Sequence, residues 1–246
     1  MIAKFRKLYT DIFQLVKNNN TNIKAARAST NEVVWSHVFH DTIKGRKWLE
    51  ELPLSPGRMA CNYSLLFVLT KILMICKPKR IVEFGLGESS KLISAFLKNE
   101  LTESTHHIVE HDNSWISFFS NNNVLSKNSA IIESRLVINN NPFPHYSYDS
   151  LAEKVSSDYD LYIIDGPFGS RQNSRLDIIS IAERFHANSE FIIIFDDCHR
   201  EGEKQTVANL IKVIERKSIV VHTGLYSGDK DQVVIATDKF RFITSL

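Results

Sequence analysis

Residues 80–90 read Arg-Ile-Val-Glu-Phe-Gly-Leu-Gly-Glu-Ser-Ser, so a short apolar strand carries the acid Glu83 near its end and then turns through Gly85 and Gly87. Glycine allows a backbone to turn tightly and to approach a ligand closely. Residues 91–97, Lys-Leu-Ile-Ser-Ala-Phe-Leu, have helical spacing. The stretch therefore predicts a strand, a glycine turn and a helix N-terminus, the arrangement with which α/β proteins hold nucleotides.

Further apolar runs follow this unit, separated by helical patterns or, after the third run, by a long loop. Parallel strands are predicted at residues 80–84, 107–110, 131–138, 161–165 and 191–195. The last two runs, 218–222 and 232–236, are joined by a linker too short for a helix, so they predict a hairpin with an antiparallel last strand. The fold class is α/β, with a mostly parallel seven-stranded sheet and helices on both faces.

The first part of the chain, residues 1–57, predicts a helical extension in front of a main domain at 58–246. Its apolar residues between 5 and 16 recur at helical spacing beside basic residues, and the polar tract 18–22 is expected to end this helix. We expect the helix to pack on the domain or on a partner subunit of a homo-oligomer; docking on a membrane surface is the alternative. The most apolar run, 65–76, contains a lysine and is shorter than the roughly 20 residues that span a bilayer, so it predicts a buried helix.

Charge and cysteine content narrow the range of partners. Thirty Lys and Arg against 28 Asp and Glu leave a net charge of +2, too balanced for a nucleic-acid-binding protein. Cys61, Cys76 and Cys198 have no metal-binding spacing, and the N-terminus does not resemble a signal peptide. We expect a cytoplasmic protein without a transmembrane segment that acts on a small molecule or a glycan.

Two features favour S-adenosylmethionine (SAM) over a dinucleotide at the glycine turn. The third glycine of the pattern G-x-G-x-x-G is replaced by Ser90, while Glu83 stands two residues before Gly85 and the last strand is antiparallel, both typical of SAM methyltransferases. Glu110, at the end of the second strand, is placed to bind ribose hydroxyls. The predicted cofactor-binding residues are Glu83, Gly85, Gly87, Ser89, Glu110, His111 and Asp165. The alternatives are a plain strand-to-helix connection at the glycines and a solvated acid at Glu110.

Three acids follow the fourth and fifth strands, Asp165 after one and Asp196 and Asp197 after the other. The carboxyl ends of parallel strands meet at one sheet edge, so these carboxylates should converge and need a positive charge among them. A divalent cation such as Mg²⁺ could supply it and would stabilise an alkoxide; Arg200 and Lys204 are the alternative.

Without a metal, Asp165, Asp197 or His199 could act as the base. The competing structural interpretations are that Asp197 caps the following helix and that Asp165 holds its own turn.

Four segments resemble the glucuronoxylan 4-O-methyltransferase family of plants. They are Phe84-Gly85-Leu86-Gly87, Glu110-His111-Asp112-Asn113-Ser114-Trp115-Ile116, Asp160-Leu161 with Asp165-Gly166-Pro167-Phe168-Gly169, and Asp196-Asp197-Cys198-His199-Arg200. The resemblance implies a class I, Rossmann-like, SAM-dependent O-methyltransferase of polysaccharide biosynthesis that methylates a uronic acid. Asp196 replaces the histidine of that family and His199 replaces its second aspartate, and we expect no counterpart of the family's membrane anchor.

The resemblance also suggests site residues. The catalytic residues it implies, together with the reasoning above, are Asp165, Asp197, His199 and Arg200. Catechol-type and macrolide-sugar O-methyltransferases bind magnesium through acids that match Asp165, Asp196 and Asp197.

A uronic acid acceptor needs a cation for its carboxylate, for which Arg175, Arg171 and Arg58 are candidates, and the rings of Tyr146 and Phe168 could stack on a sugar. The alternative functions are metal-dependent methylation of a small phenolic or secondary metabolite and a non-catalytic SAM- or nucleotide-binding module.

Overall fold

The computed structural model describes residues 2–57, 60–140 and 143–246. Its centre is a seven-stranded sheet with the order β3-β2-β1-β6-β7-β9-β8. The strands are β1 (Arg80–Phe84), β2 (Thr105–Glu110), β3 (Ser129–Glu133), β6 (Leu161–Ile164), β7 (Ile192–Phe195), β8 (Val221–Ser227) and β9 (Asp231–Thr237). The first five pair in parallel and β9 is antiparallel to both of its neighbours, which confirms the predicted α/β fold and its antiparallel last strand.

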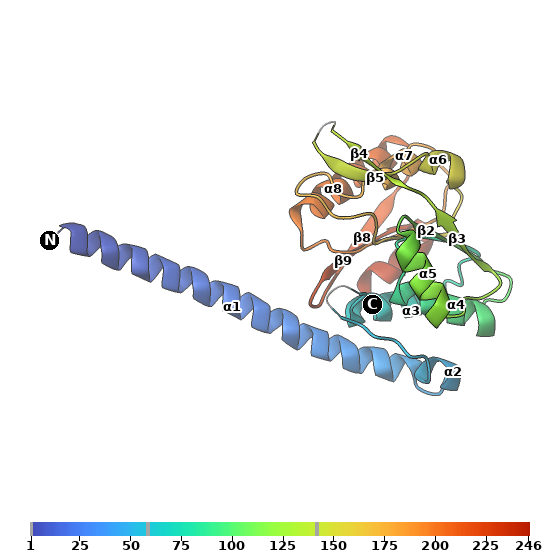
Figure 1. Ribbon diagram of the computed structural model, residues 1–246, viewed down its shortest axis with the longest axis horizontal. Helices are drawn as coiled ribbons and strands as arrows, with labels where there is room; N and C mark the ends of the chain where they lie inside the picture. Colours follow the sequence, from blue (N-terminus) through green and yellow to red (C-terminus); the bar gives the residue numbers. More distant parts are fainter. Residues whose placement is uncertain (1, 58–59, 141–142) are drawn as a thin grey trace.

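Helices cover both faces of this sheet (Figure 1). One layer contains α3 (Tyr63–Ile75) and α4 (Glu88–Asn99), with α5 (Asn113–Asn122) at the edge; the other contains α6 (Leu151–Lys154), α7 (Asp177–Ala182) and α8 (Glu201–Arg216). Side chains alternate between the two layers, so that Ile81 packs toward α3 while Val82 and Phe84 pack toward α7 and α8. Both faces of β1 are buried, which explains why its sequence is apolar almost throughout.

The third predicted strand, 131–138, is wrong as a single element. The structure ends β3 at Glu133, and the chain then leaves the sheet to form β4 (Leu136–Asn139), which pairs antiparallel with β5 (His145–Tyr148). The polar run 133–135 divides the apolar stretch, and Ile138 beyond it is 63% exposed. The predicted long loop is therefore largely a separate two-stranded hairpin.

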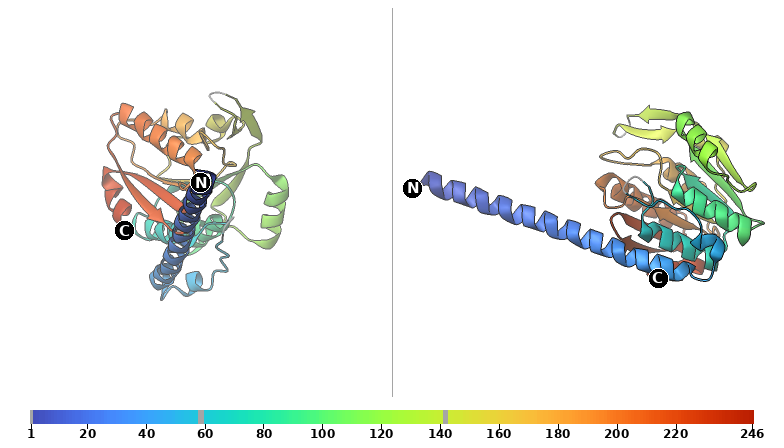
Figure 2. Two further views of the ribbon diagram at one scale, coloured as in Figure 1. Left: turned by 90° about the vertical axis from the view of Figure 1, so that its left-hand side faces the viewer. Right: turned by 60° about the horizontal axis from the view of Figure 1, so that its bottom comes forward.

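The predicted break of the first helix at residues 18–22 is also wrong. Helix α1 (Ile2–Ile43) runs through this tract without interruption and projects far from the domain (Figures 1 and 2). Asn and Thr each cost only a fraction of a kcal/mol in a helix, and the tract contains neither Gly nor Pro. The apolar residues of the projecting part, such as Phe5, Ile12 and Ile23, are more than half exposed.

The last third of α1 is part of the domain. Phe39 and Ile43 are buried in the same core as α3, together with Leu49 of the short helix α2 (Lys47–Glu50). The Trp35 Nε1 donates a hydrogen bond to the Ser227 carbonyl at the end of β8 (2.8 Å). The extension thus supports the terminal hairpin. No helix within the described ranges is both long and apolar enough to cross a membrane.

The terminal hairpin is longer than predicted. Strand β8 begins at Val221 and continues through the predicted linker to Ser227, so that residues 228–230 alone separate it from β9. Within β8, Gly224 lies directly against the Thr244 backbone of the closing 3-10 helix η1 (Asp238–Ser245), where a Cβ would collide. A glycine at this point lets η1 pack on the sheet.

Candidate active site

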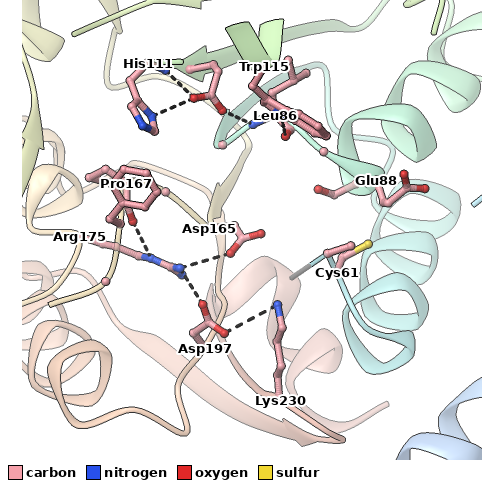
Figure 3. Close-up of a pocket in the computed structure, with 18 of the residues that line it drawn as sticks. Cys61, Leu86, Glu88, His111, Trp115, Asp165, Pro167, Arg175, Asp197 and Lys230 are labelled. Atoms are coloured by element: carbon pink, nitrogen blue, oxygen red, sulfur yellow. Dashed lines mark hydrogen bonds and ion pairs between the residues drawn. The ribbon is translucent and has the colours of Figure 1, made fainter. Parts of the chain in front are cut away.

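A cavity of about 380 Å³ lies at the carboxyl ends of β1, β2, β6 and β7. This is the sheet edge at which open α/β sheets bind ligands. The glycine turn and Glu110 line the cavity together with Asp165, Asp197 and Lys230. Leu86 and Trp115 lie on one side of it, and Asp197 and Lys230 lie on the other (Figure 3). Members of both groups of residues predicted from the sequence therefore face a single space.

The two positions of the turn are occupied by glycine for different structural reasons. Gly85 has a φ of +102°, a left-handed conformation that other residues rarely adopt, and donates its N–H to the Val109 carbonyl (2.9 Å). Gly87, at the N-cap of α4, has an extended φ of −170°, and a Cβ there would meet no atom within 4 Å. The backbone requires a glycine at Gly85, whereas at Gly87 the missing side chain keeps space open in the cavity.

Glu83 does not line the cavity. Its carboxylate is fully buried beneath the turn, where it accepts hydrogen bonds from the Ser89 and Ser90 hydroxyls and contacts His106 Nε2 at 3.1 Å. These contacts connect β1 to the start of α4 and to β2. Glu83 therefore holds the turn in place, and the Ser89 hydroxyl is already engaged in that task although Ser89 lines the cavity.

Glu110 lines the cavity and at the same time organises its wall. Its carboxylate accepts hydrogen bonds from the backbone N–H groups of Leu86 (3.0 Å), His111 (2.6 Å) and Asp112 (3.0 Å). On the same wall, Trp115 Nε1 donates to the Leu86 carbonyl at 2.7 Å. The second-strand acid thus joins the loop after β2 to the glycine turn.

Asp165, Asp196 and Asp197 converge as predicted. Strands β6 and β7 are paired in register at Ile164 and Phe195, so the residues that follow them lie side by side. Each of the three carboxylates offers one oxygen, and these oxygens all lie within 4.8 Å of one another.

Positive side chains already lie among these carboxylates. Arg175 Nη2 is 2.7 Å from Asp197 Oδ2 and 3.3 Å from Asp165 Oδ1. Arg200 Nη1 is 3.0 Å from Asp197 Oδ2, and Lys230 Nζ is 3.2 Å from Asp196 Oδ2. Lys204, which was considered from the sequence as a second source of this positive charge, is exposed.

The donor set does not fit a divalent ion as it stands. Both oxygens of Asp196 are occupied, one by Gln232 Nε2 (2.7 Å) and the other by Lys230 Nζ (3.2 Å). Asp165 and Asp197 share the Arg175 guanidinium. A metal would have to displace ammonium or guanidinium groups that are buried with their partners.

Asp165 and Asp196 differ in the direction of their pKa shifts. Burial and the neighbouring Asp196 charge raise the pKa of Asp165 well above its usual value. Burial acts to raise the pKa of Asp196 too, but Lys230 and the hydrogen bond from Gln232 outweigh it, and the pKa is lowered. Asp165 is thus the better proton acceptor of the two.

Several predicted residues lie away from the cavity. His199 and Arg171 are exposed and are not among the described residues that line it. Tyr146 is on β5, with its ring 5.8 Å from that of Phe168, and Phe168 rather than Tyr146 lines the cavity. Arg58 lies outside the described residues.

Arg175 lies before α7 rather than on it, with a left-handed φ of 58°. Lys230 and Gln232 were not predicted as site residues, because nothing in the sequence of the terminal hairpin marks them. Trp115 belongs to the segment 110–116 that carries the family resemblance, but the sequence did not predict a role for it.

No protein-family model matches the sequence, and a search of curated proteins found no similar sequence. Solved structures are similar in fold. An O-methyltransferase from Bacillus cereus in complex with SAH has a TM-score of 0.52 and 13% sequence identity, over 87% of this chain and 99% of that chain. The O-methyltransferase TomG from Streptomyces achromogenes, solved with SAM, has a TM-score of 0.49 and 11% identity, over 86% of this chain and 98% of that one. The chain has the Rossmann-like methyltransferase fold.

Proposed function

We propose that this chain is a SAM-dependent O-methyltransferase that transfers a methyl group to a hydroxyl of a sugar, a uronic acid or a glycan precursor. The observation that carries the proposal is that one cavity joins the glycine turn and Glu110 to the carboxylates Asp165 and Asp197. The first pair suits an adenosyl cofactor, and the second lies where an acceptor hydroxyl must lose its proton.

Methyl transfer from SAM depends mainly on the correct positioning of the acceptor and the cofactor. The acceptor oxygen attacks the methyl carbon of SAM, a C–O bond forms as the C–S bond breaks, and the sulfur leaves with the electron pair as S-adenosylhomocysteine. Asp165, with its raised pKa, receives the hydroxyl proton. The walls built by Trp115 and Phe168 orient the two substrates.

Arg200 is the best candidate for binding the carboxylate of a uronic acid. Its side chain is 46% exposed and lines the cavity, so part of its guanidinium is free for a ligand. Arg175, favoured from the resemblance, is only 4% exposed and is committed to Asp165 and Asp197. Phe168, which is 58% exposed, offers a face for a sugar ring.

A small phenolic acceptor is the second candidate, because the cavity also has the aromatic side chains Trp115 and Phe168 on its walls. Calorimetry with SAM and with NAD tests the cofactor, and tighter binding of NAD would overturn the proposal. A mass-spectrometric screen of sugars, uronic acids and phenols for methyl addition separates the two acceptors. SAM binding without any turnover would favour the non-catalytic alternative.

A cytoplasmic location and self-association stay predictions. The exposed apolar residues of α1 support self-association, since Phe5, Ile12 and Ile23 need a partner to leave water. Light scattering of the purified chain measures the oligomeric state, and a monomer at all concentrations would contradict this prediction.

A further inference from the structure

We infer that the Lys230 ammonium occupies the place of a divalent cation among Asp165, Asp196 and Asp197, and that it supports methyl transfer without a metal. The first half concerns the protein alone, and the second rests on the proposed function.

The ammonium lies inside the carboxylate cluster. Lys230 Nζ is 3.2 Å from Asp196 Oδ2, and the Lys230 side chain is 7% exposed. Lys230 Nζ is also 3.7 Å from Asp197 Oδ1 (Figure 3). Asp197 Oδ1 is buried and has no hydrogen-bond partner among the described residues, so the ammonium is the nearest cation to it. Lys230 thus contacts two of the three acids that would ligate a metal.

The turn that carries Lys230 is held from several sides. Glu32 of α1 accepts hydrogen bonds from the Asp229 N–H (2.8 Å) and from Asn62 Nδ2 (2.9 Å). Trp35 binds the Ser227 carbonyl before the turn, and the Cys198 N–H donates to the Asp231 carbonyl after it (2.8 Å). The ammonium is therefore placed by the fold, unlike that of a flexible surface lysine.

Each carboxylate of the cluster already has a cation beside it without a metal. Asp165, Asp196 and Asp197 face the cations Arg175, Arg200 and Lys230. A divalent ion would have to remove the ammonium from Asp196 and leave it buried without a partner, which is costly. Asp196 would also have to give up a charge-assisted hydrogen bond, because both of its oxygens are engaged.

The ammonium can perform the electrostatic part of a metal's task. Lys230 has three N–H groups, and one of them can donate to the acceptor oxygen as its negative charge develops. Lys230 keeps its protons throughout, while the hydroxyl proton goes to a carboxylate and the methyl group moves from sulfur to oxygen.

The test is a Mn²⁺ titration of the full chain, followed by the electron paramagnetic resonance signal of free Mn²⁺, with neither SAM nor acceptor present. The wild type should show no saturable binding at millimolar Mn²⁺. Lys230→Ala frees oxygens of Asp196 and Asp197 and should show saturable binding, with a Kd at least about tenfold below the highest Mn²⁺ concentration at which the wild type does not saturate. The gained binding should disappear in the double variant that also carries Asp165→Asn. Lys204→Ala, which removes an exposed lysine outside the cluster, is the matched control and should behave as wild type.

Stoichiometric Mn²⁺ binding to the wild type that is lost in Asp165→Asn would overturn the inference. Absence of binding in both wild type and Lys230→Ala would overturn the claim that the ammonium excludes the cation. If circular dichroism shows that Lys230→Ala does not fold, Lys230→Gln takes its place, since it keeps a hydrogen-bond donor toward Asp196. Because the titration requires no turnover, its outcome is independent of whether the chain is a methyltransferase. Once an acceptor is known, turnover that survives EDTA supports the second half, and turnover abolished by EDTA and restored by Mg²⁺ overturns it.

Discussion

The guanidinium of Arg175 lies 2.7 Å from the carboxylate of Asp197, and both side chains are 4% exposed. The same guanidinium donates to the carbonyls of Ile164 and Asp196, each at 3.2 Å. Both residues have left-handed backbones, with φ of 58° and 61°. Such conformations cost energy and persist where surrounding contacts enforce them. The pair therefore ties the ends of β6 and β7 together beside the cavity.

Arg175→Met should strongly destabilise the protein. The substitution leaves Asp197 and Asp165 without their shared cation in a buried position, which typically costs about 3–5 kcal/mol. Urea denaturation measures the change in the free energy of unfolding. Arg171→Met, an exposed neighbour, should stay within about 0.5 kcal/mol of wild type. Equal effects of the two substitutions would contradict the structural role of Arg175.

Asp197→Asn should abolish methyl transfer and leave SAM binding nearly intact. Asn tolerates the left-handed backbone at this position and keeps the shape of the side chain. The charge beside the acceptor is lost, so the rate should fall at least about 10²-fold. Product mass spectrometry with an identified acceptor and calorimetry with SAM are the two measurements. Full activity of the variant would remove Asp197 from the reaction centre.

Gly87→Ala and Gly85→Ala should affect different properties, SAM binding in the first variant and stability in the second. Gly87 has an extended backbone and open space beside it, so an alanine should change stability little but weaken SAM binding by entering the cavity. Gly85 has a φ of +102°, so an alanine should destabilise the fold by about 1 kcal/mol or more. Thermal denaturation and SAM calorimetry on both variants separate the effects. Unchanged SAM affinity in Gly87→Ala would show that the cofactor does not approach this turn.

Asp177 should make stability depend on pH. Burial raises its pKa from 3.8 to about 7, so the folded state holds the proton more tightly than the unfolded chain. Its contribution to stability is complete below pH 3.8 and is lost as pH rises toward and past 7, a loss of up to about 4 kcal/mol. Asp177→Asn should remove this decline, which urea denaturation at several pH values can measure. The exposed Asp11→Asn is the control, and an identical pH profile for Asp177→Asn and wild type would contradict the assignment.

Deletion of residues 2–26 should leave thermal stability unchanged, because this part of α1 projects away from the domain. Trp35→Ala in the full chain should lower the melting temperature, since Trp35 binds the Ser227 carbonyl and packs on Phe67 with ring centroids 5.1 Å apart. Differential scanning calorimetry measures both. A large loss on deletion would mean that the projecting segment supports the fold, for example through a second copy.

Much of the fold could be predicted because its signals are local. The apolar runs of β1, β6 and β7 mark buried parallel strands, and the acids that follow them must meet at one sheet edge. The departure of the chain after Glu133 was not predicted, because an apolar run does not specify its pairing partner. The continuity of α1 was not predicted either, because the polar tract at 18–22 is compatible with a helix but does not indicate one.

The sequence by itself determined the glycine turn, the strand-end acids Asp165, Asp196 and Asp197, and hence the place of the site. Only the tertiary structure decided what neutralises these acids and where Glu83 faces. Glu83 shares the α4 side of β1 with Ile81, beneath the turn rather than in the cavity. Lys230 reaches Asp196 from 34 positions further along the chain. Periodicity along a strand is a local property, whereas the pairing of buried charges depends on which distant segments pack together.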